Sequence, residues 1–405
     1  MLSTDSSPAA SSAYVHLPFC KRRCYYCDFP VSVVGANHSG QVVQDGMQAY
    51  VDLLCHEIKA THEMHTQPLQ TIFFGGGTPS LIPPHMLQQI LATLAQCFGI
   101  ALNAEISMEA DPGTFDAARL RDYMALGVKR FSVGVQAFQE DLLKACGRSH
   151  TLADVHEAIA AVHEAGVPAW SLDLMSGLPF LTPELWQQSL KEAIAAEPSH
   201  ISVYDLQVED KTPFGRWYKP GASPLPSDST AANMYQAASQ TLRHAGFEHY
   251  EVSNYAKPGF RCQHNLVYWH GAPFLAFGLG AASYLRSRRF SRPRKMAAYT
   301  AWVDGFCAAG GGVPGLELPA ESAEDRLLDM VMLRLRLADG LDLRQVEDTF
   351  GRATAADVRR VLQRHVSTGL VTHNDTNVMR LSDPAGFLVS NDIISDVFAA
   401  VMPDE

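Results

Sequence analysis

Short apolar runs rich in β-branched and aromatic residues alternate with longer amphipathic stretches along the first half of the chain. The short runs have the length and composition of buried strands, and the longer stretches repeat their apolar positions at the helical spacing. The predicted strands are YVHLP from Tyr14, TIFF from Thr71, EISME from Glu105, RFSVG from Arg130, AWSLDLM from Ala169 and HISVYDL from His200. The predicted helices cover residues 46–65, 84–97, 115–126, 151–165, 183–196 and 228–245.

This alternation predicts an α/β fold in which parallel strands are joined by right-handed crossovers. Six such units predict a partial (β/α)6 barrel, similar to a TIM barrel that does not close. In this arrangement functional groups lie on the loops that follow the carboxyl ends of the strands. The motifs described below fall at these strand ends.

Shifts in composition divide the chain into segments. The opening MLSTDSSPAASSAY is small and polar, and TPFGRWYKPGASPLPSDS from Thr212 is rich in Pro, Gly and Ser. The glycine run AAGGGVPG from Ala308 indicates a hinge. We expect a disordered tail at 1–12, the barrel at 13–245, a β-containing extension at 246–310 and a small, mainly helical, winged-helix-like C-terminal domain at 320–405.

The composition narrows the partners and the compartment. The chain has 405 residues, with 43 acidic and 32 basic side chains and a formal net charge of −11. Such a surface repels a phosphate backbone, so nucleic acid is not an expected partner. No stretch approaches the roughly 18 consecutive apolar residues of a membrane-spanning helix. The polar opening lacks the apolar centre of a secretory signal, so we expect the cytoplasm, or an organelle stroma or matrix.

Three of the eight cysteines, Cys20, Cys24 and Cys27, lie in one loop directly after the first predicted strand. Soft thiolates at this short spacing bind zinc or an iron–sulfur cluster. A structural zinc ion needs four ligands, and the nearest further cysteine is well down the chain at Cys55. The loop therefore favours a cluster of four irons with one iron left open, and zinc with a distant ligand is the alternative. The cysteines expected to be packing residues are Cys55, Cys97, Cys146 and Cys307.

The spacing of this triplet, with the aromatic Tyr26 directly before the last cysteine, resembles the signature of the radical SAM superfamily. The resemblance implies a [4Fe-4S] cluster on Cys20, Cys24 and Cys27, with S-adenosylmethionine bound to the remaining iron. It also implies reductive cleavage of S-adenosylmethionine to methionine and a 5′-deoxyadenosyl radical.

Glycines and isolated polar residues follow the ends of the next predicted strands. The glycines of FFGGGTPS let the backbone approach a ligand, and in this context they resemble the superfamily motif that contacts the methionine amino group. Glu109 ends the third strand, Gln136 follows the fourth and Asp173 lies in the fifth, each among apolar neighbours. Such polar groups face a ligand at a barrel mouth, or else make structural hydrogen bonds inside the barrel.

Longer strings narrow the resemblance. YVHLPFCKRRCYYCDF, FFGGGTPS, SMEADPGT, FSVGVQAF and SLDLMSGLP resemble the anaerobic coproporphyrinogen III oxidases and their relatives, the HemW-type haem chaperones. The match runs from about residue 13 to the C-terminus. The positions that the resemblance assigns to S-adenosylmethionine contacts are Tyr14, Gly76, Gly77, Thr78, Glu109, Gln136, Arg148 and Asp173.

Two departures separate this chain from the oxidases. They continue the triplet with a further cysteine where this chain has Phe29, and they carry a long N-terminal extension before the triplet. This chain also has a segment, CQHNLVYWHG, that resembles the HNxxYW motif of the haem chaperones, a motif absent from the oxidases. An imidazole can ligate haem iron, and flat aromatic rings can pack on the macrocycle. The haem-binding candidates are His264, Asn265, Tyr268 and Trp269, with His270 and Cys262 as spare candidates for the iron ligand.

Two functions of different classes follow from these features. The preferred hypothesis is a haem chaperone on a radical SAM scaffold, which binds haem and delivers it to acceptor haemoproteins, and a homodimer is compatible with it. The alternative is an oxygen-independent coproporphyrinogen III oxidase that decarboxylates propionate side chains. The protein can in principle cleave S-adenosylmethionine, whereas the two departures put the oxidase activity in doubt. A partly buried histidine beside core aromatics is the structural alternative for the HNLVYW segment.

Overall fold

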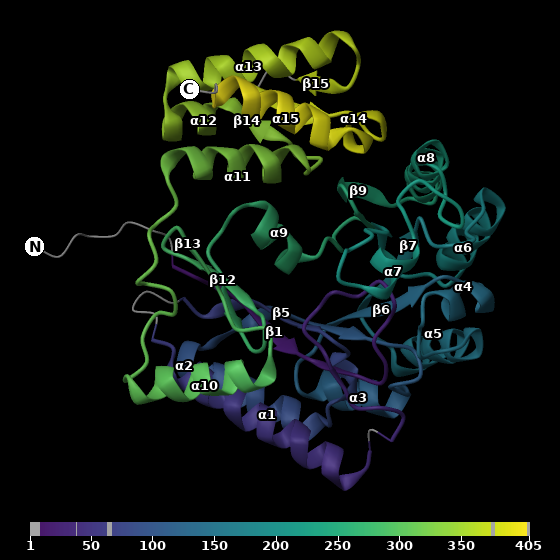
Figure 1. Ribbon diagram of the computed structural model, residues 1–405, viewed down its shortest axis with the longest axis vertical. Helices are drawn as coiled ribbons and strands as arrows, with labels where there is room; N and C mark the ends of the chain where they lie inside the picture. The colour runs from purple at the N-terminus through teal and green to yellow at the C-terminus, as the bar shows by residue number, and fades with distance from the viewer. Residues whose placement is uncertain (1–8, 38, 63–66, 374–376, 403–405) are drawn as a thin grey trace, which may run out of the picture.

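The computed structural model describes residues 9–37, 39–62, 67–373 and 377–402. Its centre is a nine-stranded sheet in the order β11-β1-β4-β5-β6-β7-β8-β10-β9 (Figure 1). The six predicted strands are confirmed as neighbours that all run parallel. They are β1 (Ser12–Leu17), β4 (Leu69–Gly76), β5 (Ile100–Ala110), β6 (Arg130–Gln136), β7 (Ala169–Ser176) and β8 (His200–Asp205).

Helices connect these strands and pack on the outer face of the sheet (Figure 1). They are α1 (Gln41–Ala60), α2 (Pro84–Phe98), α3 (Ala117–Ala125), α4 (Glu140–Ala145), α5 (Leu152–Ala165), α6 (Pro183–Ala195) and α8 (Asp228–His244). The short α7 (Pro213–Trp217) lies instead against the loop that carries Cys24 and Cys27, where the Phe214 N–H donates to the carbonyl of Tyr25 at 3.0 Å. Hydroxyl or carboxylate caps define several of the starts, such as Thr151, Thr182 and Ser227. All six predicted helices are confirmed, and the short α4 and α7 were not predicted.

Both ends of the first predicted helix differ from the prediction. The helix begins at Gln41 rather than at 46, and it ends at Ala60 because Thr61 leaves it to pair with Gly312. The rest of the predicted range reaches into residues 63–66, which lie outside the described residues. At the N-terminus, Ser12 already pairs with Thr71 in the sheet, so order begins before the predicted end of the tail. Residues 1–8 of that tail lie outside the described residues.

The extension predicted at 246–310 completes the sheet at both edges. Its strand β11 (Leu275–Phe277) pairs parallel to β1. At the other edge, β10 (Asn254–Ala256) pairs antiparallel to β8, and β9 (Glu248–Glu251) follows it. The segment also forms the hairpin β12 (Ala282–Leu285) and β13 (Arg288–Ser291), and two helices that the sequence did not predict, α9 (Gln263–Trp269) and α10 (Met296–Ala308).

A buried ion pair fastens this extension to the barrel. Arg292 Nε lies 2.7 Å from Glu57 Oε1, and both side chains are completely buried. Glu57 also accepts hydrogen bonds from the Tyr299 hydroxyl at 2.6 Å and the Gly278 N–H at 2.9 Å. Buried charges are stable only when they are paired and hydrogen-bonded, and these groups come from α1, the loop after β11, the segment after β13 and α10. The glycine run predicted as a hinge is also bound here, because the Gly312 N–H donates to the carbonyl of Ala60 at 2.9 Å.

The C-terminal segment has an apolar core of its own, which includes Val331, Leu335, Val358 and Leu362. It is mainly helical, as predicted, and its winged-helix-like character stays a prediction. Its elements are α11 (Ala323–Leu335), β14 (Leu341–Asp342), α12 (Leu343–Phe350), α13 (Arg352–Ser367), β15 (Val371–His373), β16 (Val378–Leu381), α14 (Ala385–Leu388) and α15 (Ser390–Val401). In Figure 1 this domain stands above α9, and α11 packs against α9. No helix among the described residues is both long and apolar enough to cross a membrane.

Candidate functional site

A cavity of about 460 Å³ opens at the carboxyl ends of the barrel strands, and we call it the cluster cavity. Cys20, Cys24 and Cys27 all line it. Their loop is closed at its base by the two short strands β2 (Phe19–Cys20) and β3 (Ser32–Val33). Arg23 also holds the loop, because its guanidinium donates to the carbonyl of Phe29 at 3.0 Å. The three predicted thiol ligands therefore face one space at the strand ends.

Arg148 connects the cysteine loop to the barrel wall. Its Nη1 lies 3.4 Å from the Cys24 sulfur and 3.0 Å from the Tyr26 hydroxyl. Its Nη2 donates to Asp111 Oδ1 at 2.5 Å and to the carbonyl of Gly134 at 3.0 Å. Arg148 Nε is buried without a hydrogen-bond partner among the described residues. A guanidinium in this place offsets negative charge that develops on the sulfurs.

The predicted glycines bring the end of β4 against the cysteine loop. Gly76 has φ +116° and its N–H donates to Glu109 Oε2 at 3.0 Å. A Cβ at Gly76 would collide with the His16 ring, and a Cβ at Gly77 would lie 2.7 Å from the carbonyl oxygen of Phe19. Thr78, next along the chain, places its hydroxyl 3.8 Å from the Cys20 sulfur. Only glycine permits this approach, so backbone groups are presented to the cavity.

Three polar side chains predicted at the strand ends line the same cavity. Burial raises the pKa of Glu109 to about 7, although the Gly76 N–H opposes the shift. Burial also raises the pKa of Asp173, which accepts hydrogen bonds from Ser132 at 2.8 Å and Ser171 at 3.1 Å. Gln136 has φ +70° at an irregularity in the pairing of β6 with β7, a strained backbone that turns its side chain toward the cavity.

Seven of the eight predicted S-adenosylmethionine contacts line the cluster cavity, and Tyr14 does not. Tyr14 lies deeper, in an adjoining cavity of about 240 Å³ that we call the inner cavity. The two cavities share five lining residues, Phe29, Glu109, Ser132, Asp173 and Tyr204. Asp111, the ion partner of Arg148, was missed as a functional residue. Asp111 lies two residues after Glu109, at the end of the same strand, and this position would have identified it as a candidate residue at the barrel mouth.

The donor set fits a [4Fe-4S] cluster and a polar ligand beside it. Burial raises the pKa of the Cys20 thiol to about 12 and also raises that of Cys27, so iron must displace protons when it binds. Three soft sulfurs, a cationic Arg148 and an open glycine backbone surround one space. Within the described ranges, no group of three or more His, Cys, Asp or Glu side chains is arranged to hold a single metal ion.

The other cysteines follow the packing prediction only in part. Cys55 and Cys146 are buried, as predicted, whereas Cys97 and Cys307 are exposed. Both exposed residues lie near the ends of their helices, and the helical pattern alone did not distinguish the outer face there.

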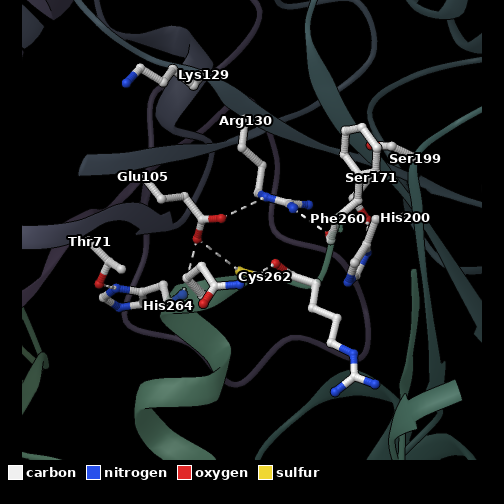
Figure 2. Close-up of polar contacts among 12 residues, drawn as sticks. Thr71, Glu105, Lys129, Arg130, Ser171, Ser199, His200, Phe260, Cys262 and His264 are labelled. Atoms are coloured by element: carbon white, nitrogen blue, oxygen red, sulfur yellow. Dashed lines mark hydrogen bonds and ion pairs between the residues drawn. The ribbon is translucent and has the colours of Figure 1, made fainter. Parts of the chain in front are cut away.

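The HNLVYW segment forms α9, and its first half is tied to the amino-terminal side of the barrel. Figure 2 shows Glu105 between Arg130 on one side and Cys262 with His264 on the other. Glu105 Oε2 lies 3.3 Å from Arg130 Nε, and Glu105 Oε1 accepts the His264 N–H at 3.1 Å. Arg130 in turn donates to the carbonyl of Phe260 at 2.5 Å. This network fixes the start of α9 against strands β5 and β6.

His264 itself is completely buried, and both of its ring nitrogens are hydrogen-bonded. Nδ1 shares a hydrogen bond with the Thr71 hydroxyl at 2.7 Å, and Nε2 shares one with the Tyr268 hydroxyl at 2.8 Å. The ring also stacks on Phe73 at a centroid distance of 5.3 Å. Burial lowers the pKa of His264 to about 3, so the ring is neutral. In this conformation neither nitrogen is open to an iron, and its role as a haem ligand stays a prediction.

The other haem candidates divide between two spaces. Asn265 and Tyr268 line the inner cavity, and Cys262 lies there too, with its sulfur 3.7 Å from Glu105 Oε1. Trp269 and His270 instead line a separate cavity of about 660 Å³ between α9 and α11, which we call the α9–α11 cavity. Tyr268 borders both the inner and the α9–α11 cavities. The motif predicted a single haem site for all of these residues, whereas the turn of α9 directs Asn265 toward the inner cavity and Trp269 and His270 toward the α9–α11 cavity.

Three cysteines at this spacing, at the mouth of a parallel β/α barrel, define a radical SAM protein. The radical SAM superfamily profile matches residues 14–193, and the HemN C-terminal domain profile matches residues 322–388. A protein of Synechocystis named heme chaperone HemW is 41% identical over 418 residues, which covers all of both chains. The chain belongs to the radical SAM superfamily and, within it, to the HemW family.

Further relatives agree with this family. A Bacillus subtilis protein named heme chaperone HemW is 32% identical, covering 94% of this chain and 97% of its own. A mouse protein named radical S-adenosyl methionine domain-containing protein 1, mitochondrial, is 34% identical, covering 69% of this chain and 62% of its own. Among solved structures, the coproporphyrinogen III oxidase HemN of Escherichia coli superposes with a TM-score of 0.79 at 23% identity, covering 97% of this chain and 90% of its own. That likeness establishes the fold, including the helical C-terminal domain.

Proposed function

We propose that this protein binds haem and delivers it to acceptor haemoproteins. The observation that carries the proposal is the 41% identity, over the whole of both chains, with a protein named heme chaperone HemW. The site supports it, because Phe29 occupies the position where the oxidases continue the cysteine motif. The Phe29 side chain borders the cluster cavity and is 54% exposed, so this rim offers an apolar ring and no fourth thiol.

The cluster cavity would hold two cofactors in this proposal. Cys20, Cys24 and Cys27 would ligate a [4Fe-4S] cluster, and the glycine and carboxylate groups beside them would bind S-adenosylmethionine. When bound, the cluster supplies an electron to S-adenosylmethionine. The chain's own contribution is electrostatic, since Arg148 places its positive charge against Cys24 and is itself fixed by Asp111. The proposed S-adenosylmethionine contacts remain Tyr14, Gly76, Gly77, Thr78, Glu109, Gln136, Arg148 and Asp173.

The partners and the compartment are also part of the proposal. The partners are haem and acceptor haemoproteins, and a homodimer is compatible with this function. We place the activity in a reducing compartment, the cytoplasm or an organelle stroma or matrix, because scattered thiols and a thiolate-bound cluster persist there.

A haem titration of the anaerobically reconstituted protein tests the proposal. We expect a saturable Soret band near one haem per chain, followed by transfer of that haem to an apo-haemoprotein added in excess. Bovine serum albumin loaded with haem provides a control for nonspecific release. If haem does not bind, the chaperone proposal fails, and formation of protoporphyrinogen from coproporphyrinogen III with S-adenosylmethionine and a reductant would favour the oxidase instead.

A further inference from the structure

The α9–α11 cavity has the size and the walls of a ligand site. Its volume of about 660 Å³ falls within the range of about 300–1,000 Å³ that small-molecule and cofactor sites occupy. It lies where the barrel extension meets the C-terminal domain, and α9 and α11 form facing walls (Figure 1). Its apolar lining includes Trp269, Phe274, Met330, Leu333 and Phe350. A flat apolar ligand would find aromatic and thioether contacts on several sides.

Basic side chains also line this cavity, although the chain as a whole is acidic. Arg289, Arg326 and Arg334 border it, against one carboxylate, Asp329. Arg289 is neutralised by that carboxylate at 2.7 Å. Neither Arg326 nor Arg334 forms an ion pair or a side-chain hydrogen bond with another described residue. The carboxylate that acts on the charge of Arg334 is Asp339, but it is itself ion-paired with Arg261 at 3.4 Å. Both cavity guanidinium groups can therefore pair with an anionic ligand, and guanidinium pairs with carboxylate in a two-pronged geometry.

An imidazole completes the set. His270 follows directly after α9, is exposed, and lines the cavity beside Trp269. Its ring makes no hydrogen bond with another described residue, in contrast to the ring of His264. A histidine nitrogen without a partner, at the edge of an apolar cavity, is the group that ligates haem iron in many proteins.

We propose that haem binds in the α9–α11 cavity, with His270 as an iron ligand and with Arg326 and Arg334 pairing with the propionates. This proposal rests on the proposed function and locates the haem within it. The apolar walls pack on the macrocycle, the imidazole ligates the iron and the two arginines form ion pairs with the propionate carboxylates. The cavity therefore matches all three chemical parts of haem, and it shares no lining residue with the cluster cavity.

The same geometry gives His264 a different role from that of a ligand. Its hydrogen bond to Thr71 and its stacking on Phe73, both in β4, hold α9 against the barrel. Its bond to Tyr268 lies within α9, and together these contacts fix the direction in which Trp269 and His270 emerge. His264 is thus a positioning residue. The HNLVYW segment keeps its link to haem, but the contacts come from the end of the helix and from α11.

Two ligands and two kinds of variant separate the parts of the proposal. The ligands are haem and iron-free protoporphyrin IX, titrated into the reconstituted full-length protein. His270→Ala should weaken haem binding about tenfold and shift the Soret band, while leaving protoporphyrin binding unchanged because that ligand has no iron. The Arg326→Ala/Arg334→Ala double variant should lower the affinity for both haem and protoporphyrin IX about tenfold or more, because both ligands carry the propionates.

Matched controls lie elsewhere on the surface. His85→Ala and Arg364→Ala remove an exposed histidine and an exposed arginine outside the cavity, and both should bind like the wild type. Iron content and circular dichroism establish that each variant is folded and loaded with its cluster. If the wild type binds haem but the cavity variants match the controls, the haem site is elsewhere and this inference is wrong. If the wild type does not bind haem, the proposed function itself fails.

Discussion

The cluster cavity and the α9–α11 cavity share no lining residue and are assembled in different ways. The cluster cavity is built from a single cysteine loop and from residues at the carboxyl ends of neighbouring parallel strands. The α9–α11 cavity combines the end of a short helix with side chains from α11 and α12, about 60 to 80 residues further along the chain. Strand topology brings the first set together automatically, whereas the second set depends on how one domain docks on the other.

The largest expected difference between the two cavities comes from removing a cluster ligand. Cys24→Ser should abolish the roughly four irons per chain and the associated brown colour, because a hydroxyl is a poor substitute for a soft thiolate. Haem binding in the α9–α11 cavity should remain. Iron analysis and the haem titration, performed on the same reconstituted sample, measure the two effects.

Cys97→Ser is the matched control, since Cys97 is exposed and lies outside the cluster cavity. It should retain both the cluster and haem binding. Full iron content in Cys24→Ser would contradict the ligand assignment. Loss of haem together with the cluster would show that the two cavities are not independent.

The sequence predicted the first cavity better than the second for a physical reason. Alternating strand and helix patterns can be recognised from short segments of sequence, and the carboxyl ends of parallel strands lie at one edge of the sheet. Cys20, Glu109 and Asp173 could therefore be predicted to lie together from their positions in the predicted strands and the loops that follow them. The side chain of Tyr14 lies below that edge and lines the inner cavity instead. Strand assignment does not specify this depth.

The second cavity could not be predicted because its elements depend on tertiary context. The extension at 246–310 does contain strands, as expected, but the prediction did not place the helix α9 within it. The start of α9 is bound by Glu105 and Thr71, which are distant in the sequence. A seven-residue helix has too few turns to show a clear periodicity. The partners Arg326 and Arg334 carry no motif, and only the docking of α11 identifies them as part of a site.

A second, smaller effect tests whether His264 positions α9. His264→Ala leaves a cavity and removes the partners of Thr71 and Tyr268, so we expect a loss of about 3 kcal/mol in the free energy of unfolding. Haem affinity should fall less than in His270→Ala, and the cluster should stay intact. Chemical denaturation and haem titration provide the two readouts.

Thr71→Val is the matched variant here, because it removes one hydrogen-bond partner of His264 and nearly conserves volume. It should cost about 1 kcal/mol in the free energy of unfolding. A haem Soret band that disappears in His264→Ala at full stability would instead make His264 the ligand, and the positioning role would be excluded.

An effect smaller than that of His264→Ala concerns pH and separates two buried carboxyl groups, Glu109 at the cluster cavity and Glu251 near the C-terminal domain. Burial raises the pKa of each to about 7. Glu251 is completely buried, accepts a hydrogen bond from the Ser253 N–H at 3.0 Å, and pairs through its backbone with Leu337. A carboxyl whose folded pKa is raised stabilises the fold most below its unfolded pKa, near 4.5, and loses that contribution as the pH rises through 7.

Glu251→Gln carries no titrating proton, so the fall in its free energy of unfolding from pH 5 to pH 8 should be smaller than that of the wild type by about 2 kcal/mol. Denaturant titrations at several pH values measure this slope. Glu109→Gln should also reduce the pH dependence of the free energy of unfolding, and in addition it should weaken the binding of S-adenosylmethionine. Glu251→Gln should leave that binding unchanged, because Glu251 lies outside the cluster cavity. An equal loss of S-adenosylmethionine affinity in both variants would mean that the junction with the C-terminal domain and the cluster cavity respond as one unit.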